Sequence, residues 1–74
     1  MWINNTGNVL IGTTTDNGYR LDIDAGAMRF AEMTAPSAPA ANSVVIYAED
    51  NGAGKTRLMA LFSSGAAQQI AIQP

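Results

Sequence analysis

The stretch SVVIYAEDNGAGKTRLMALFSSGAAQQIAIQ, residues 43–73, decides the fold of this chain. It contains three β-prone runs separated by two turns rich in Gly, Asn and Ser: Val44–Tyr47, Thr56–Phe62 and Ala66–Gln73. In the last run Ile70 and Ile72 alternate with small or polar residues, as in a strand with one apolar face. Short turns between consecutive strands favour antiparallel neighbours, so the stretch predicts a three-stranded meander.

The first two of these runs carry apolar side chains on both faces of the predicted sheet. Val44–Tyr47 has no polar position, and Leu58–Phe62 has none either. A sheet formed by one short chain covers one of its faces at best, so the second face needs another cover. Identical chains are the simplest source of that cover, and the pattern therefore predicts self-association.

Towards the N-terminus, shorter segments also have β character. Val9–Ile11 is a β-prone run between two glycines, and Tyr19–Asp24 alternates strictly between apolar and charged residues. Between them, Asn17-Gly18 can supply the positive φ values that a tight reversal requires. We therefore expect an N-terminal repeat with a β-hairpin over residues 1–34.

The middle of the chain, residues 27–42, is expected to connect the N-terminal and C-terminal parts. Ala27–Met33 fits both a strand and a short helix, because it is too short for its period to decide, and we favour a strand. Residues 35–42 contain two prolines among alanines, which disfavour helix and predict an extended segment that crosses to a neighbouring subunit. With a C-terminal meander over residues 43–74, we expect one cooperative unit in three parts.

Size and composition support the need for a partner. A 74-residue chain buries only about 60% of its unfolded surface, so its stability alone is marginal. There are no Cys and no His residues, which excludes disulfides and removes the usual metal ligands. Charged residues make up 14% of the chain, against about 25% in an average soluble domain. A small protein with so little charge is expected to place much of its surface against other protein.

Several functions are disfavoured by what the sequence contains. The net charge of −2 gives no basic footprint for nucleic acid, and no apolar run is long enough to insert into a membrane. Gly52–Thr56 resembles half a phosphate-binding loop, but Glu49 stands where the first glycine belongs. Asp22–Gly26 lacks the later ligands of a calcium loop. We expect no catalytic residues, no metal and no cofactor.

The N-terminus shows no signal peptide, and its abrupt start leaves open whether the chain is a fragment of a longer protein.

The segment GNVLIGTTTDNGYRLDI, residues 7–23, resembles a module that recurs in bacteriophage tail fibres and related bacterial surface fibres. The pattern is a strand, an Ile-Gly-Thr-Thr turn, a basic residue and Leu-Asp-Ile. Where the family continues with Asn-Gly, this chain has Asp24-Ala25-Gly26. The second half is similar to the segment that follows in such fibres, so the resemblance covers about residues 7–72. It implies an elongated homotrimer of interwoven β-structure that links a virion to a receptor-binding end.

Together these observations predict an all-β fold of short strands and tight turns, assembled as an interwoven parallel homotrimer in a virion tail fibre. Its partners would be two further copies, adjacent fibre segments and, as an open question, a glycan of the host surface. Six apolar residues are expected to form the trimer core: Val45, Tyr47, Leu58, Phe62, Ile70 and Ile72. Two alternatives remain: a glycan-binding fibre tip, with Trp2 near Asn4 and Asn5 as its candidate site, and a monomeric β module that binds protein through the edge strand Val44–Tyr47.

Overall fold

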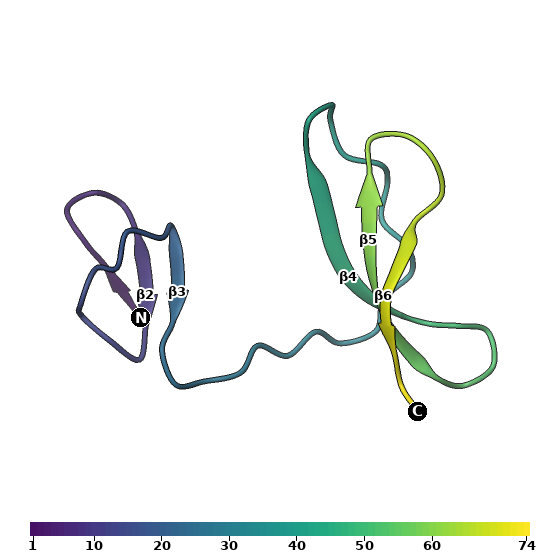
Figure 1. Cartoon of the computed structure of the whole chain (residues 1–74), viewed down its shortest axis with the longest axis horizontal. Coiled ribbons are helices and arrows are strands. Elements are labelled where there is room, and N and C mark those ends of the chain that lie inside the picture. The colour runs from purple at the N-terminus through teal and green to yellow at the C-terminus, as the bar shows by residue number, and fades with distance from the viewer.

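The computed structural model describes all residues from 1 to 74 and is all-β. Six strands form two separate three-stranded sheets, joined by a long arm (Figure 1). The strands are β1 (Trp2–Ile3), β2 (Val9–Ile11), β3 (Leu21–Ile23), β4 (Val44–Asp50), β5 (Thr56–Phe62) and β6 (Gln68–Ile72). No strand of one sheet contacts a strand of the other.

The C-terminal sheet is the predicted meander, with strand order β4-β5-β6 and antiparallel pairing throughout. The β4–β5 hairpin runs in regular register from Val44 opposite Phe62 to Asp50 opposite Thr56. The Asn51 side chain supports the turn between them, because its Oδ1 accepts the Ala53 N–H at 2.8 Å. Between β5 and β6 the register shifts near Leu58 and Met59, which marks a β-bulge.

The N-terminal sheet has the order β1-β2-β3 and differs from the expected arrangement. The hairpin joins β1 to β2, whereas β2 and β3 run parallel. Asn17-Gly18 therefore does not reverse the chain between two paired strands, although Gly18 does have a positive φ of 91°. The third strand covers only Leu21–Ile23 of the alternating stretch, and the flanking Arg20 and Asp24 each make one backbone hydrogen bond to β2.

A loop over residues 12–20 makes the parallel pairing of β2 and β3 possible. It must carry the chain from the end of β2 back to the level of Val9, where the Arg20 carbonyl accepts the Val9 N–H at 2.7 Å. The loop starts at Gly12, whose φ is +82° and where an added Cβ would lie 2.7 Å from the Asp24 carbonyl oxygen. Only glycine allows this close approach of the two backbones.

The arm between the sheets contains no strand, so the prediction of a strand over Ala27–Met33 is wrong. A strand needs a hydrogen-bonded neighbour, and only Glu32 forms a bridge, to Ala48 at the edge of β4. The Met33 N–H donates to the Ala48 carbonyl at 2.9 Å, and the Thr56 hydroxyl donates to Glu32 Oε2 at 2.6 Å. Glu32 thus docks the middle of the arm, residues 24–43, on the C-terminal sheet.

Candidate self-association surface

The register of the β4–β5 hairpin sorts its apolar side chains onto two faces. Residues that pair across neighbouring strands point to the same side of a sheet, and the side alternates along each strand. Val45 pairs with Leu61 and Tyr47 with Met59, and we name these four residues the inner face. The other alternating set forms the outer face: Val44, Ile46, Ala48, Leu58, Ala60 and Phe62, followed by Asp50 and Thr56 at the turn.

The inner face is the core of the C-terminal sheet. Tyr47, Met59 and Leu61 form one buried cluster, against which Val45 and Ala67 pack. The arm runs from Glu32, beside Ala48, back to the start of β4, and it rises behind the sheet in Figure 1. Its prolines, at positions 36 and 39, are half-buried while most of its other residues are exposed. The chain therefore supplies the cover for this face itself.

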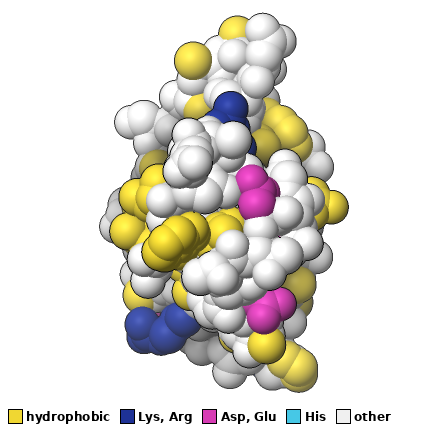
Figure 2. Space-filling model, turned by 90° about the vertical axis from the view of Figure 1, so that its left-hand side faces the viewer, with side chains coloured by type: hydrophobic (Ala, Val, Ile, Leu, Met, Phe, Trp, Pro, Cys, Tyr) yellow, Lys and Arg dark blue, Asp and Glu magenta, His cyan; other side chains and the backbone are white.

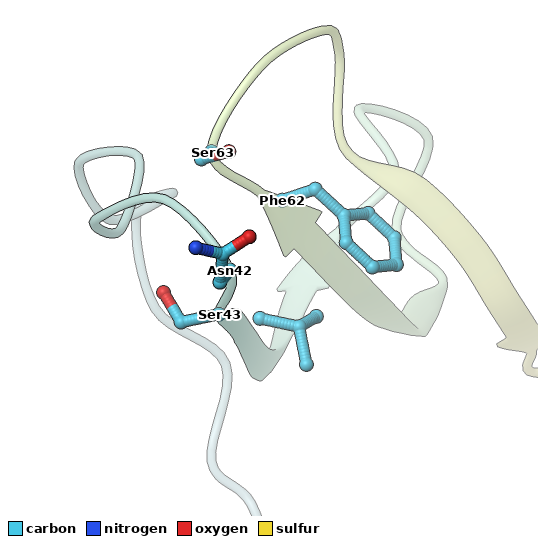
Figure 3. Close-up of a pocket in the computed structure, with 5 residues that line it drawn as sticks. Asn42, Ser43, Phe62 and Ser63 are labelled. Atoms are coloured by element: carbon cyan, nitrogen blue, oxygen red, sulfur yellow. The ribbon is translucent and has the colours of Figure 1, made fainter.

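The outer face is open at the end away from the β4–β5 turn. Val44, Ile46 and Phe62 there are 47%, 49% and 44% exposed, whereas Leu58 and Ala60 are half-buried and Ala48 is buried. Figure 3 shows the end of this face, where Phe62 at the tip of β5 lies near Asn42 and Ser43. These residues line an open hollow of about 360 Å³. Contiguous apolar surface of this kind marks an interaction site in a soluble protein.

The six residues expected to form one trimer core do not share one face. Val45 and Tyr47 belong to the inner face, whereas Leu58 and Phe62 belong to the outer face. Ile72 pairs with Arg57, which stands on the inner side, and Ile70 lies in the bulged part of β6. Within one chain these residues therefore lie on two faces: Tyr47 is 2% exposed and covered by the chain itself, whereas Phe62 is 44% exposed. Their part in a trimer core stays a prediction.

Sequence reasoning missed Val44 as part of the exposed surface and Met59 and Leu61 as core. The pairing of β4 with β5 would have identified them, because it decides which residues of the two strands lie on the same face. Once Asp50 pairs with Thr56, even-numbered residues of β4 share a face with even-numbered residues of β5. The outer face then follows by counting, without any further information.

Tyr47 brings one unpaired polar atom into the inner core, because its hydroxyl is buried without a hydrogen-bond partner. Leaving such a group unpaired costs about 1–3 kcal/mol, so we expect Tyr47→Phe to keep or raise the stability of the protein. Urea unfolding followed by circular dichroism measures the change. A clear loss of stability in Tyr47→Phe would instead mean that the hydroxyl finds a partner in the assembled protein.

The N-terminal unit is held by a polar cluster centred on Asp16. Its Oδ1 accepts the Gly18 N–H at 2.7 Å, and its Oδ2 accepts the Asn4 side-chain amide at 2.7 Å. The buried Asn8 side chain donates to both oxygens, at 3.2 and 3.4 Å. The cluster joins the loop over residues 12–20 to the β1–β2 turn and so fixes the path that makes β2 and β3 parallel.

These bonds lower the pKa of Asp16 below its ordinary value of 3.8, the Gly18 N–H first and the Asn8 amide second. Because the folded state holds the proton less tightly than the unfolded state, the stabilisation is present above pH 3.8 and is lost as the pH falls through the lowered pKa. We expect the thermal midpoint of the N-terminal unit to drop below pH 4. In Asp16→Asn, melting curves recorded between pH 6 and pH 2.5 should lack this part of the drop; an equally steep drop there would contradict the assignment.

The side chains were also compared with the requirements of a metal site and of a membrane span. No group of three or more acidic, His or Cys side chains lies close enough to hold a metal ion. The one ion pair joins Arg57 and Glu49 at 2.7 Å, at the end of the inner face. No helix in the structure has the length and apolar character needed to cross a membrane.

The chain matches no family model, and searches of curated proteins and of solved structures found no similar protein. The interpretation of the outer face therefore rests on the residues and geometry of this chain.

Proposed function

We propose that this chain is a structural, trimerising segment of a fibre, of the kind that links a bacteriophage virion to its receptor-binding end. In this proposal three chains lie parallel around a common axis, interwoven through their extended arms, and their strands close around it so that no apolar sheet face stays open. The segment would be located in the virion tail fibre, with adjacent fibre segments as neighbours. It would have no catalytic role and bind no cofactor.

The shape of the single chain supports a partner. Its accessible surface is 5449 Å², whereas a compact monomer of 7.7 kDa exposes roughly 4,300 Å². Its radius of gyration is 15.2 Å, against about 11 Å for a compact domain of this length. The chain thus leaves open roughly a quarter more surface than a self-sufficient protein of its size.

The observation that carries the proposal is the outer face of the C-terminal sheet. It is apolar at each position from Val44 to Ala48 and from Leu58 to Phe62, and its inner counterpart is already covered by the same chain. Three such faces turned towards one axis would bury this apolar part together, with Asp50 left at the turn end. A single chain cannot gain this burial, so the proposed assembly would supply stability that a chain of 74 residues lacks on its own.

Light scattering on a sizing column tests the proposal directly. Three chains of 7.7 kDa give about 23 kDa, and we expect this mass to persist on dilution from 100 to 1 µM. A folded species of 7.7 kDa at every concentration would reject the trimer and favour a monomeric protein-binding module. For that alternative, β6 is the fully open edge, because β4 is paired with Glu32 of the arm.

A glycan-binding role is a second candidate, favoured by one open hollow. Trp2, which is 52% exposed, lines this hollow together with Asn4, Asn5, Thr6 and Asp16. Aromatic and amide groups side by side suit a sugar. However, both Asp16 oxygens and the Asn4 amide are used in bonds within the cluster, which leaves few groups for a ligand. Binding on a glycan array that is lost in Trp2→Ala would support this role.

A further inference from the structure

The N-terminal sheet has an apolar face of its own, separate from the outer face. Ile3 pairs with Val9, Val9 pairs with Leu21, and Ile11 pairs with Ile23. Because paired residues share a side and sides alternate along a strand, five side chains stand together, and we name them the aliphatic face: Ile3, Val9, Ile11, Leu21 and Ile23. Ile3, Ile11 and Leu21 are 59%, 41% and 51% exposed.

The chain covers this face only in part, since Val9 and Ile23 are half-buried while the other three residues are exposed. The two sheets make no strand contacts with each other, and the arm leads away from β3 towards the C-terminal sheet (Figure 1). The opposite side of the sheet already has a cover, since Leu10 on that side is fully buried. Figure 2, which views the molecule from the N-terminal side, shows hydrophobic side chains at the surface with few charged groups between them.

From this geometry we infer that the aliphatic face is a second self-association surface, on which the N-terminal sheets of three copies pack against one another. The inference rests on the proposed trimer, because the C-terminal sheets bring the three N-terminal units together. Once the C-terminal sheets have associated, the arm keeps the N-terminal sheets of the three chains at a local concentration in the millimolar range. At that concentration, apolar contacts too weak to associate free chains are sufficient to hold the N-terminal sheets together.

The distribution of charge favours a copy of this chain as the occupant. Asp22 pairs with Leu10 and therefore stands on the opposite side, and alternation places Arg20 and Asp24 on that side too. The aliphatic face carries no charge and no polar side chain, so identical copies meet there without like charges in contact. A polar ligand would find nothing to bind on it.

Trypsin cleavage of the full chain tests the inference, because Arg20 adjoins β3 while Arg29 lies in the arm. In the wild-type trimer we expect cleavage after Arg20 to be at least tenfold slower than after Arg29, which serves as an internal reference. In Ile11→Asp we expect cleavage after Arg20 to become at least tenfold faster while the mass stays at three chains. Asn5→Asp makes the same change in net charge in an exposed turn and should behave as wild type.

A cysteine variant gives a readout that does not depend on how Ile11→Asp folds. The chain has no cysteine, so oxidation of Ile11→Cys should join chains into covalent dimers, and Asn5→Cys should not. A wild-type trimer in which Arg20 is cut as fast as Arg29, and in which Ile11→Cys links no faster than Asn5→Cys, would overturn this inference and leave the proposed function standing. A wild-type monomer would overturn both.

Discussion

Replacing Ile46 by aspartate should convert the proposed trimer, three chains of 7.7 kDa or about 23 kDa, into a folded monomer. Ile46 lies at the centre of the outer face and is 49% exposed in the single chain. A carboxylate there stays solvated in the monomer and disturbs little. In a trimer it would be buried without a partner, which costs several kcal/mol in each chain. Light scattering gives the mass, and circular dichroism shows whether the sheet is retained.

Lys55→Ala is the matched control for Ile46→Asp, because each changes the net charge from −2 to −3. Lys55 is exposed in the β4–β5 turn, so we expect its removal to leave the mass and the stability unchanged. Leu58→Asp, on the same outer face, should repeat the loss of assembly. If both aspartate variants remain soluble trimers, the outer face is not the interface and the proposed function fails.

The C-terminal sheet could be predicted from the sequence because its determinants are local. The Val44–Tyr47 run, the turn after Asp50 and the strand Thr56–Phe62 each follow from adjacent residues. The bulge between β5 and β6 could not be predicted, because it depends on how Gln69 and Ala71 pair with neighbouring residues of β5. The register was not known from the sequence, so the six expected core residues include members of both faces.

The N-terminal sheet was predicted less well for a physical reason. Local alternation identifies β2 and β3 as strands but does not fix their relative direction. That direction depends on bonds between Asp16 and side chains eight and twelve positions earlier, Asn8 and Asn4. Such contacts leave no periodic signal, whereas a turn pair such as Asn17-Gly18 suggests a hairpin strongly enough to mislead.

The two sheets also differ in how they are stabilised. The inner face of the C-terminal sheet has three buried apolar side chains, while the N-terminal unit has one, Leu10, which is fully buried. The sequence predicts one cooperative unit for the whole chain. The absence of strand contacts between the sheets leads us to expect that the N-terminal unit can unfold while the C-terminal sheet persists.

Leu10→Ala should therefore unfold the N-terminal unit alone. Truncating a buried leucine costs about 2–5 kcal/mol, and no second buried apolar side chain in this unit can compensate. In ¹H–¹⁵N spectra we expect the amide signals of residues 2–23 to collapse towards random-coil positions, while those of residues 44–72 keep their dispersion.

Thr14→Ala, an exposed change in the loop over residues 12–20, should leave every signal in place and serves as the control for Leu10→Ala. The mass of Leu10→Ala should stay at three chains, because the outer face, through which we propose that the C-terminal sheets associate, is unchanged. Simultaneous loss of both sets of signals would show that the two sheets fold as one unit, and that the arm transmits stability between them. Retention of trimer and C-terminal signals would place the origin of assembly in β4–β6, where a face that the chain cannot cover itself requires its own copies.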